Sequence, residues 1–419
     1  MTLNAMNLQD DTRRRLGWRA GLAALVLLML AAVLVFLYLY RQDIILALIL
    51  GRGDTEWARD IEQDNSTGHE SATAVVATGN GFSVVGHTNS RRPAVEQAWV
   101  LRFDKAPPPR WERIYAGEKL GTSGHAIASR PGGLVIAGTA HVDRGFRAWL
   151  LALSPEGSVL WERTPGQVGV NGLNAVSVLE DGSIVAGGAQ EGEGWVVRMD
   201  SRGELLWEVK LPRLEQVTAL VPLPAQGIAL VGKAETSTVG LGISRLLLLG
   251  ADGRATAEQQ LPAEGQGELN ALALLPDGGF VATGRRSRPD STDWGLWVVR
   301  MDPRGEILWE HVPEGSQVEA GHGVAVFPDG SIAVVGFSWK ELVDREAKVW
   351  RLSADGRLLW QQSYGGAGDD LGYGIARLED ESLVVVGSTT SKGAGKTDLW
   401  TFGLSPEGQL LWEETFGAP

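Results

Sequence analysis

The chain has 419 residues, of which 44% are hydrophobic and 21% charged, a composition that excludes a disordered or collagen-like protein. Its net charge is −13, and no run of Lys or Arg is long enough to neutralise a series of phosphates, so nucleic acid is not an expected partner. The absence of Cys excludes disulfides, thiolate metal ligands and thiol nucleophiles. With 55 Gly and 16 Trp, the chain suits a large core with many tight turns and aromatic packing.

A charge-free segment of 21 residues, 20–40, predicts a transmembrane helix, because a helix of that length spans roughly 30 Å of hydrocarbon. Four Arg residues lie within 13–19, so the positive-inside rule places the N-terminus in the cytoplasm. Tyr38 and Tyr40 end the segment where a cleavable signal peptide would have small residues, which indicates a retained signal anchor. We therefore expect a single-pass inner-membrane protein whose remaining chain lies outside the cytoplasm, in the periplasm.

The sequence divides into four expected regions. A cytoplasmic tail (1–19) precedes the transmembrane signal-anchor helix (20–40), and an interfacial linker (41–56) leads into a repetitive domain (57–419). The apolar stretch 44–50 within the linker is too short to span a bilayer, so it is expected in the outer interface or packed under the domain.

The domain is built on a repeat of about 50 residues, and its clearest copy runs from Trp360 to Trp412. Six copies close on a tryptophan, and copy four has Ala257 in that place; the tryptophans are Trp111, Trp161, Trp207, Trp309, Trp360 and Trp412. A glycine that ends a β-branched run marks all seven copies, at Gly86, Gly138, Gly187, Gly232, Gly284, Gly336 and Gly387. The number of complete copies is therefore seven.

Each copy contains four short segments of alternating hydrophobicity, separated by turn residues, which leaves no room for helices. Four-stranded units of this period are typical of propeller blades, and a blade must pack against neighbours on both faces. The sequence thus predicts an all-β, seven-bladed β-propeller. Gly53–Trp57 repeats the spacing of the last strand, so one more strand is expected to pair with the terminal blade or to lie beside it.

A second tryptophan precedes the closing tryptophan by twelve residues in five copies: Trp99, Trp149, Trp195, Trp297 and Trp400. Such regular recurrence favours packing over a carbohydrate-stacking face, and the closing tryptophans are likewise expected to be buried between blades. Copy four has Arg245 and Ala257 at the two positions, which predicts a blade that is weakened or covered by a partner.

The copies resemble bacterial extracytoplasmic propeller repeats of the form D-G-G-x-I-V-x-G followed by D-x-W-L-x-K-L-D-x-x-G-x-x-x-W. They are more distantly similar to the tryptophan-docking repeats of quinoprotein-like propellers. The resemblance covers about residues 57–419 and implies the fold, whereas proteins with such repeats have many roles. Quinoprotein dehydrogenases usually have eight blades and a vicinal cysteine pair, and this chain has neither eight full copies nor Cys.

Seven polar residues share one register in the first strand of each copy: Thr73, His125, Asn174, Thr218, Asn270, His322 and Tyr373. Because the first strand of a blade is innermost, they are expected to ring one mouth of the central channel. Two interpretations stay open. The ring satisfies inner-strand backbone and channel water, or it binds a ligand or a metal.

The loop Gly365–Asp370 places two carboxylates, Asp369 and Asp370, side by side and is the candidate Ca²⁺ loop, although it lacks D-x-D-x-D spacing. A solvated turn is the alternative. No G-x-S-x-G, H-E-x-x-H or P-loop sequence occurs, so catalysis is not expected and no cofactor other than Ca²⁺ is considered.

These features favour a membrane-anchored, non-catalytic propeller that binds protein or envelope components through its loops. The alternative is a periplasmic enzyme or ligand sensor, quinoprotein-like, that uses the mouth of the channel. The sequence identifies neither the partner nor the ligand.

Overall fold

The computed structural model describes residues 68–417 apart from short gaps, which are 80, 91–94, 117–120, 143–144, 170, 235–241, 263–265, 288–293, 314–317, 341–343 and 395. The predicted tail, transmembrane helix, linker and Trp57 strand lie outside the described residues. Within the part of the chain that is described, no helix has the length and hydrophobicity needed to cross a bilayer.

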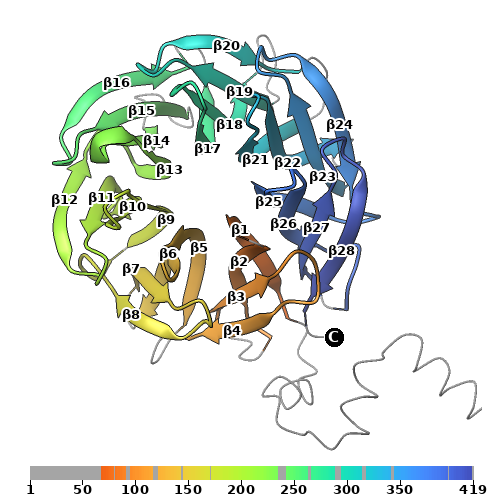
Figure 1. The fold of residues 1–419 in the computed structure, drawn as a ribbon, viewed down its shortest axis with the longest axis horizontal. Helices are drawn as coiled ribbons and strands as arrows, with labels where there is room; N and C mark the ends of the chain where they lie inside the picture. The colour runs from red at the N-terminus through yellow and green to blue at the C-terminus, as the bar shows by residue number, and fades with distance from the viewer. Residues whose placement is uncertain are drawn as a thin grey trace, which may run out of the picture. The chain divides into compact units, whose positions relative to one another are not determined.

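Seven four-stranded antiparallel sheets form a ring, and each sheet uses four strands that follow one another in the chain (Figure 1). The expectation of seven four-stranded blades is therefore confirmed. Blades 1 and 2 comprise β1 (Glu70–Thr78), β2 (Gly81–Thr88), β3 (Gln97–Phe103), β4 (Trp111–Tyr115), β5 (Thr122–Arg130), β6 (Gly133–Val142), β7 (Gly145–Leu153) and β8 (Val159–Arg163).

Blades 3 to 5 continue the ring with the same order of strands. They comprise β9 (Asn171–Val178), β10 (Ile184–Gln190), β11 (Glu193–Met199), β12 (Leu205–Leu211), β13 (Gln216–Pro222), β14 (Ile228–Ala234), β15 (Ile243–Leu249), β16 (Ala255–Leu261), β17 (Gly267–Leu274), β18 (Phe280–Ser287), β19 (Trp294–Met301) and β20 (Ile307–His311). A 3-10 turn, η2 (Pro224–Gln226), connects β13 to β14.

Blades 6 and 7 complete the ring and bring the last blade against the first (Figure 1). They comprise β21 (Val318–Val326), β22 (Ile332–Lys340), β23 (Asp344–Leu352), β24 (Leu358–Tyr364), β25 (Asp370–Arg377), β26 (Leu383–Thr389), β27 (Asp398–Leu404) and β28 (Leu410–Phe416). The first strand of every blade lies at the centre of the ring and the fourth at its rim (Figure 1).

The hydrophobic core lies between blades. Each cluster of buried side chains draws on two successive blades, as where Val135 and Leu150 of blade 2 meet Trp195 of blade 3. The tryptophans of the third strands are part of this core, and Trp195 and Trp297 are fully buried. The expected packing role of this series is therefore confirmed, because a blade can cover its apolar faces only against its neighbours.

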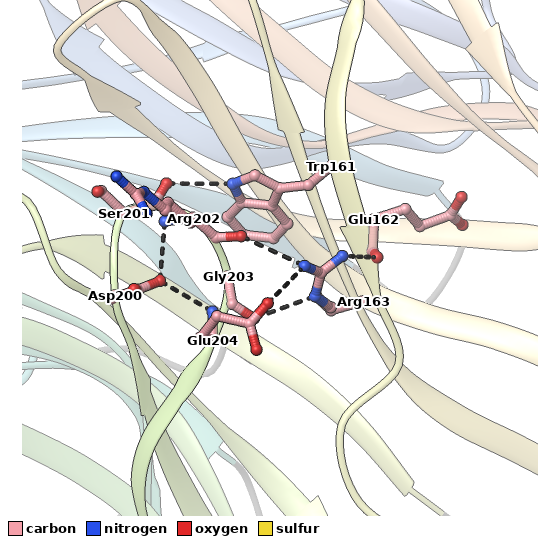
Figure 2. Close-up of polar contacts among 8 residues, drawn as sticks. All are labelled: Trp161, Glu162, Arg163, Asp200, Ser201, Arg202, Gly203 and Glu204. Atoms are coloured by element: carbon pink, nitrogen blue, oxygen red, sulfur yellow. Dashed lines mark hydrogen bonds and ion pairs between the residues drawn. The ribbon is translucent and has the colours of Figure 1, made fainter.

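The closing tryptophans on the fourth strands have a different place. They are half-exposed, so the expectation that they are buried is wrong. Figure 2 shows why: the indole of Trp161 lies over the turn of the next blade and donates from Nε1 to the carbonyl oxygen of Ser201 at 3.2 Å. Gly203 of that turn has φ +81°, and a Cβ there would lie 2.9 Å from the indole, so the site requires glycine.

The same bond from a closing tryptophan to the turn of the next blade recurs at four other boundaries. The donors and acceptors are Trp111 to Pro155, Trp207 to Ala251, Trp309 to Ala354 and Trp360 to Pro406, at 3.0 to 3.1 Å. Each bond ties the rim of one blade to the next. The tryptophan that recurs at the end of the sequence repeat therefore makes the same contact between blades at each of these boundaries.

Blade 4 has Ala257 in the place of the tryptophan and lacks this bond. Leu246, which is 1% exposed, fills the space instead: a Cβ on Gly305 of blade 5 would lie 2.6 Å from its Cδ2. Within the unusual Leu246–Leu249 run, Leu246 therefore takes the place of the indole against blade 5. The four strands of blade 4 pair continuously apart from two bulges.

Candidate functional site at the channel mouth

The seven polar residues of the shared register all occupy one structural position. In every blade the pairing of the first and second strands shifts by one residue, and the residue left out of the ladder is the polar one: Thr73, His125, Asn174, Thr218, Asn270, His322 and Tyr373. Each is therefore the extra residue of a β-bulge on an innermost strand. All seven are half-buried.

Six of these side chains cross to the next blade. Each contacts the backbone carbonyl oxygen of the residue that precedes the next member of the ring: Thr73 to Gly124 (2.7 Å), His125 to Leu173 (3.0 Å), Asn174 to Val217 (3.1 Å), Thr218 to Leu269 (2.8 Å), Asn270 to Gly321 (2.9 Å) and His322 to Gly372 (3.0 Å). We call this set the inner belt. It satisfies carbonyl groups that the bulges leave without a partner.

The two histidines of the inner belt are neutral in the folded protein. Burial lowers the pKa of both His125 and His322, although the backbone hydrogen bond that each makes acts in the opposite direction. Because a carbonyl oxygen only accepts, the Nδ1 atom of each ring carries the proton. The polar atoms of these residues thus have a structural partner, and the ligand-binding role stays a prediction.

Tyr373 is the exception in the ring. Its hydroxyl has no hydrogen-bond partner among the described residues, and its ring stacks on His322 with centroids 5.3 Å apart and planes 17° apart. Tyr373 belongs to β25, so the missing bond falls at the boundary between blades 7 and 1. We call this boundary the closing seam.

A cavity of about 350 Å³ opens at the closing seam. Its lining comes from blades 6, 7 and 1 and gathers at the end of the ring where the inner strands begin: His69, Glu70, Ser71, His87, Arg345, Asp369, Leu371, Tyr373, Ser388, Thr390 and Thr397. We call it the seam cavity. Of the seven ring residues, it includes Tyr373 and no other.

The lining of the seam cavity is polar. Nη2 of Arg345 lies 2.5 Å from Oδ2 of Asp369, and this guanidinium is the main reason that the pKa of Asp369 is lowered. Nδ1 of His69 lies 3.2 Å from the hydroxyl of Thr397. Burial lowers the pKa of His87, so that imidazole is neutral. The cavity therefore offers hydroxyls, neutral imidazole and a paired guanidinium to a ligand.

The candidate Ca²⁺ loop is occupied by donors of the protein itself. Asp369 binds Arg345, and Asp370 is fully buried and not part of a solvated turn. Asp370 accepts from the amide of Gly366 at 2.7 Å, from the hydroxyl of Ser391 at 2.8 Å and from the hydroxyl of Thr389. Within the ranges that the structure describes, no three His, Asp or Glu side chains gather as a metal site.

Sequence reasoning missed most of the seam cavity. The cavity includes side chains that have no counterpart in the other copies of the repeat, so no recurring pattern marks them: His69, His87 and Arg345. One signal was present: Tyr373 is the only aromatic phenol in a series of short polar and imidazole side chains. That break in the series falls at the boundary where the cavity opens.

No family model matches the chain, and no curated protein matches it. Among solved structures it is similar to a protein from Lactobacillus plantarum, with 14% identity and a TM-score of 0.53, over 84% of this chain and 97% of that chain. It is also similar to the WD40 domain of Pan2 from Neurospora crassa, with 12% identity and a TM-score of 0.50, over 79% and 90%.

A third similar structure is the β-propeller domain of the trilobed protease from Pyrococcus furiosus, with 12% identity, a TM-score of 0.48 and coverage of 84% and 96%. At such low identity these likenesses concern the fold alone. The first two likenesses support the propeller fold, and the quinoprotein-like resemblance stays a prediction.

Proposed function

We propose that this protein is a membrane-tethered, extracytoplasmic binding propeller without catalytic activity, and that it holds a protein partner or envelope component at the channel mouth. The observation that supports this most directly is the seam cavity. It is large enough to receive one or two side chains of a partner, and its polar lining suits specific hydrogen bonds. The loops around it provide the surrounding surface.

The rest of the ring supplies rigidity. The inner belt joins six pairs of neighbouring blades, and the tryptophan bonds join five of the same pairs at the rim. A preorganised surface loses little conformational entropy on binding, which favours affinity. The closing seam leaves the hydroxyl of Tyr373 for a partner.

The tether rests on the sequence. The charge-free segment 20–40 and the arginines before it predict an uncleaved anchor with the propeller outside the cytoplasm. A periplasmic reporter enzyme fused after Pro419 should be active, and a reporter that works only in the cytoplasm should be inactive at the same place. Cytoplasmic activity, or a mature chain that starts after Tyr40, would contradict this topology.

A ligand sensor is the second candidate, and the lining of the seam cavity favours it. Neutral His87, the hydroxyl of Tyr373 and the hydroxyls of Ser71 and Thr397 could bind a small polar molecule without a partner protein. The first candidate function requires a protein or envelope partner, and the second requires only a small polar molecule. A pull-down from solubilised membranes distinguishes them, because it recovers a macromolecular partner.

The test compares two Ser→Trp variants on inner strands in pull-downs of the full chain from detergent-solubilised membranes. Ser71→Trp fills the seam cavity, whereas Ser129→Trp places the same group on an exposed position at the other end of β5. We expect a partner to be recovered with the wild type and with Ser129→Trp but not with Ser71→Trp. Equal recovery with both variants would exclude the seam cavity as the binding site.

A further inference from the structure

Four polar side chains in the lining of the seam cavity make no hydrogen bond within the part of the chain that the structure describes: Ser71, His87, Tyr373 and Ser388. Other members of the lining are paired, since Asp369 binds Arg345 and His69 contacts Thr397. Ser388 is 5% exposed, so its hydroxyl lies in a largely dry place without a protein partner. Because buried polar groups are normally hydrogen-bonded, these open positions indicate a ligand.

The geometry of the open groups suits a ligand with diverging donors. Each group accepts a hydrogen bond, either on a hydroxyl oxygen or on the unprotonated ring nitrogen of neutral His87. They lie on four different strands, β1, β2, β25 and β26, and so are separate acceptors. A guanidinium prefers two coplanar oxygens, and the carboxylate of Asp369 already gives both of its oxygens to Arg345. The three N–H bonds of a primary ammonium reach separate acceptors instead.

The charges around the cavity favour a cation. Glu70 and Asp369 belong to the lining, and the fully buried Asp370 directly follows Asp369. Arg345 offsets Asp369, because its Nη2 lies 2.5 Å from Oδ2 of that residue. Neither Glu70 nor Asp370 has a Lys or Arg partner among the described residues, and the donors to both are hydroxyl or amide groups. An anion in the cavity would therefore be repelled, and a neutral ligand would gain no Coulomb attraction.

We propose that the seam cavity receives the ammonium group of a lysine side chain from the protein partner. This rests on the proposed function and names the chemistry that the partner presents. Nζ of the lysine donates to the open acceptors, and its four-carbon stem packs along Leu371, an aliphatic member of the lining. A cavity of about 350 Å³ admits one such side chain together with water.

Glu70 contributes through its charge. Burial raises the pKa of this carboxyl group, and a cation in the cavity favours the ionised form. The hydroxyls of Thr88 and Ser90 donate to its Oε1 and hold the side chain in place. Glu70 is therefore a positioning residue for the charge of the ligand, whereas the hydrogen bonds to the ammonium group come from the open acceptors.

The test measures the binding of short peptides to the full chain in detergent by saturation-transfer NMR. A Gly-Gly-Lys-Gly-Gly peptide with both ends blocked should bind. The same peptide with an acetylated lysine should bind at least about tenfold more weakly, because acetylation removes the positive charge. The matching arginine peptide should also bind more weakly than the lysine peptide. Equal binding of the lysine and acetyl-lysine peptides, or no binding of the lysine peptide, would overturn the proposal.

Two variants locate the bound peptide, and thermal unfolding shows whether each variant is folded. Ser71→Trp should abolish binding of the lysine peptide, and Ser129→Trp, at its exposed position, should keep it. Glu70→Gln removes the charge without the bulk of an indole and should weaken binding about two- to fivefold, as expected for one charge pair. Lysine binding that either Ser71→Trp or Glu70→Gln leaves unchanged would contradict this location.

A failure of the lysine chemistry and a failure of the binding site give different results. If the pull-down separates Ser71→Trp from Ser129→Trp but the lysine peptide does not bind, the seam cavity holds its partner through other groups. If the pull-down recovers the partner equally with both variants, the seam cavity is not the binding site. Binding of n-butylammonium as tight as that of the lysine peptide would make a free amine the ligand and exclude the lysine of a partner.

Discussion

The boundary between blades 2 and 3 and the closing seam between blades 7 and 1 are built differently. At the first, His125 crosses the inner strands and Trp161 crosses the rim, and Arg163 adds bonds to Gly203 and Glu204 (Figure 2). At the closing seam, neither Tyr373 nor Trp412 has a hydrogen-bond partner among the described residues.

Aromatic packing takes the place of those bonds at the closing seam. Trp412 stacks on Phe82 with centroids 5.9 Å apart, and Phe82 stacks on Phe103 at 4.5 Å. Aromatic packing is less directional than a hydrogen bond. The comparison therefore indicates that inner-belt bonds join the blades at six boundaries. At the seventh, where the seam cavity lies, aromatic packing and the bond from the amide of Glu70 to the carbonyl oxygen of Thr397 join them instead.

The largest loss of stability should come from the hydrophobic core between the blades. Trp195→Ala should cost about 3 to 5 kcal/mol, because a fully buried indole leaves a cavity between blades 2 and 3. Trp207→Ala, on a half-exposed indole one strand later, should cost about 1 to 2 kcal/mol. Urea unfolding measures both, and equal losses would show that the two series are not distinct.

The inner belt should give the next largest effect. His125→Ala and His322→Ala should each cost about 1 to 3 kcal/mol, because each leaves the carbonyl oxygen of a buried residue, Leu173 or Gly372, without its donor. Tyr373→Phe at the closing seam removes a hydroxyl without a partner and should change stability by less than about 0.5 kcal/mol. If Tyr373→Phe costs as much as either histidine variant, the closing seam is not exceptional.

The pH dependence of stability tests the same histidines. Because burial depresses their pKa in the folded state, the unfolded chain binds more protons as the pH falls through the ordinary histidine value. Stability should therefore fall from pH 7.5 to 5.5, by at most about 1.4 kcal/mol per pH unit for each histidine. The double variant His125→Asn, His322→Asn should show a shallower slope in urea titrations, and an unchanged slope would assign the dependence to other groups.

Among the variants that remove a contact, the smallest effect should come from the rim ion pair of the boundary between blades 2 and 3. Arg163→Ala removes an exposed pair with Glu204 and should cost no more than about 1 kcal/mol. Thermal unfolding in low and high salt would check this, since salt screens an exposed pair. A larger loss would mean that the bonds from Arg163 to the turn carbonyls dominate.

Much of the fold could be predicted from the sequence because the repeat specifies it seven times. The spacing of Gly and Trp predicted the number of blades, and the alternation of hydrophobic and polar residues predicted the strands. The half-exposure of Trp161 could not be inferred, since it depends on the turn of the next blade. Periodicity shows that a residue recurs but not which neighbour covers it.

The candidate site was predicted only in part. The shared register of the polar ring led to the right strands, yet the bonds of the inner belt depend on bulges that the sequence does not show. Glu70 and Thr397, which both line the seam cavity, are 327 positions apart and meet only because the ring closes. Unique residues brought together by closure carry no repeat signal.

Hydrogen exchange of the full chain, followed by mass spectrometry, tests most directly the claim that the closing seam is the weakest boundary. Inner-strand amides of β1 and the edges of β25 to β28 should exchange earlier than the equivalent amides of blades 2 and 3, because local opening should start where the inner-belt bond and the tryptophan bond are both missing. Uniform protection around the ring, or earliest exchange at the boundary between blades 2 and 3, would contradict the account.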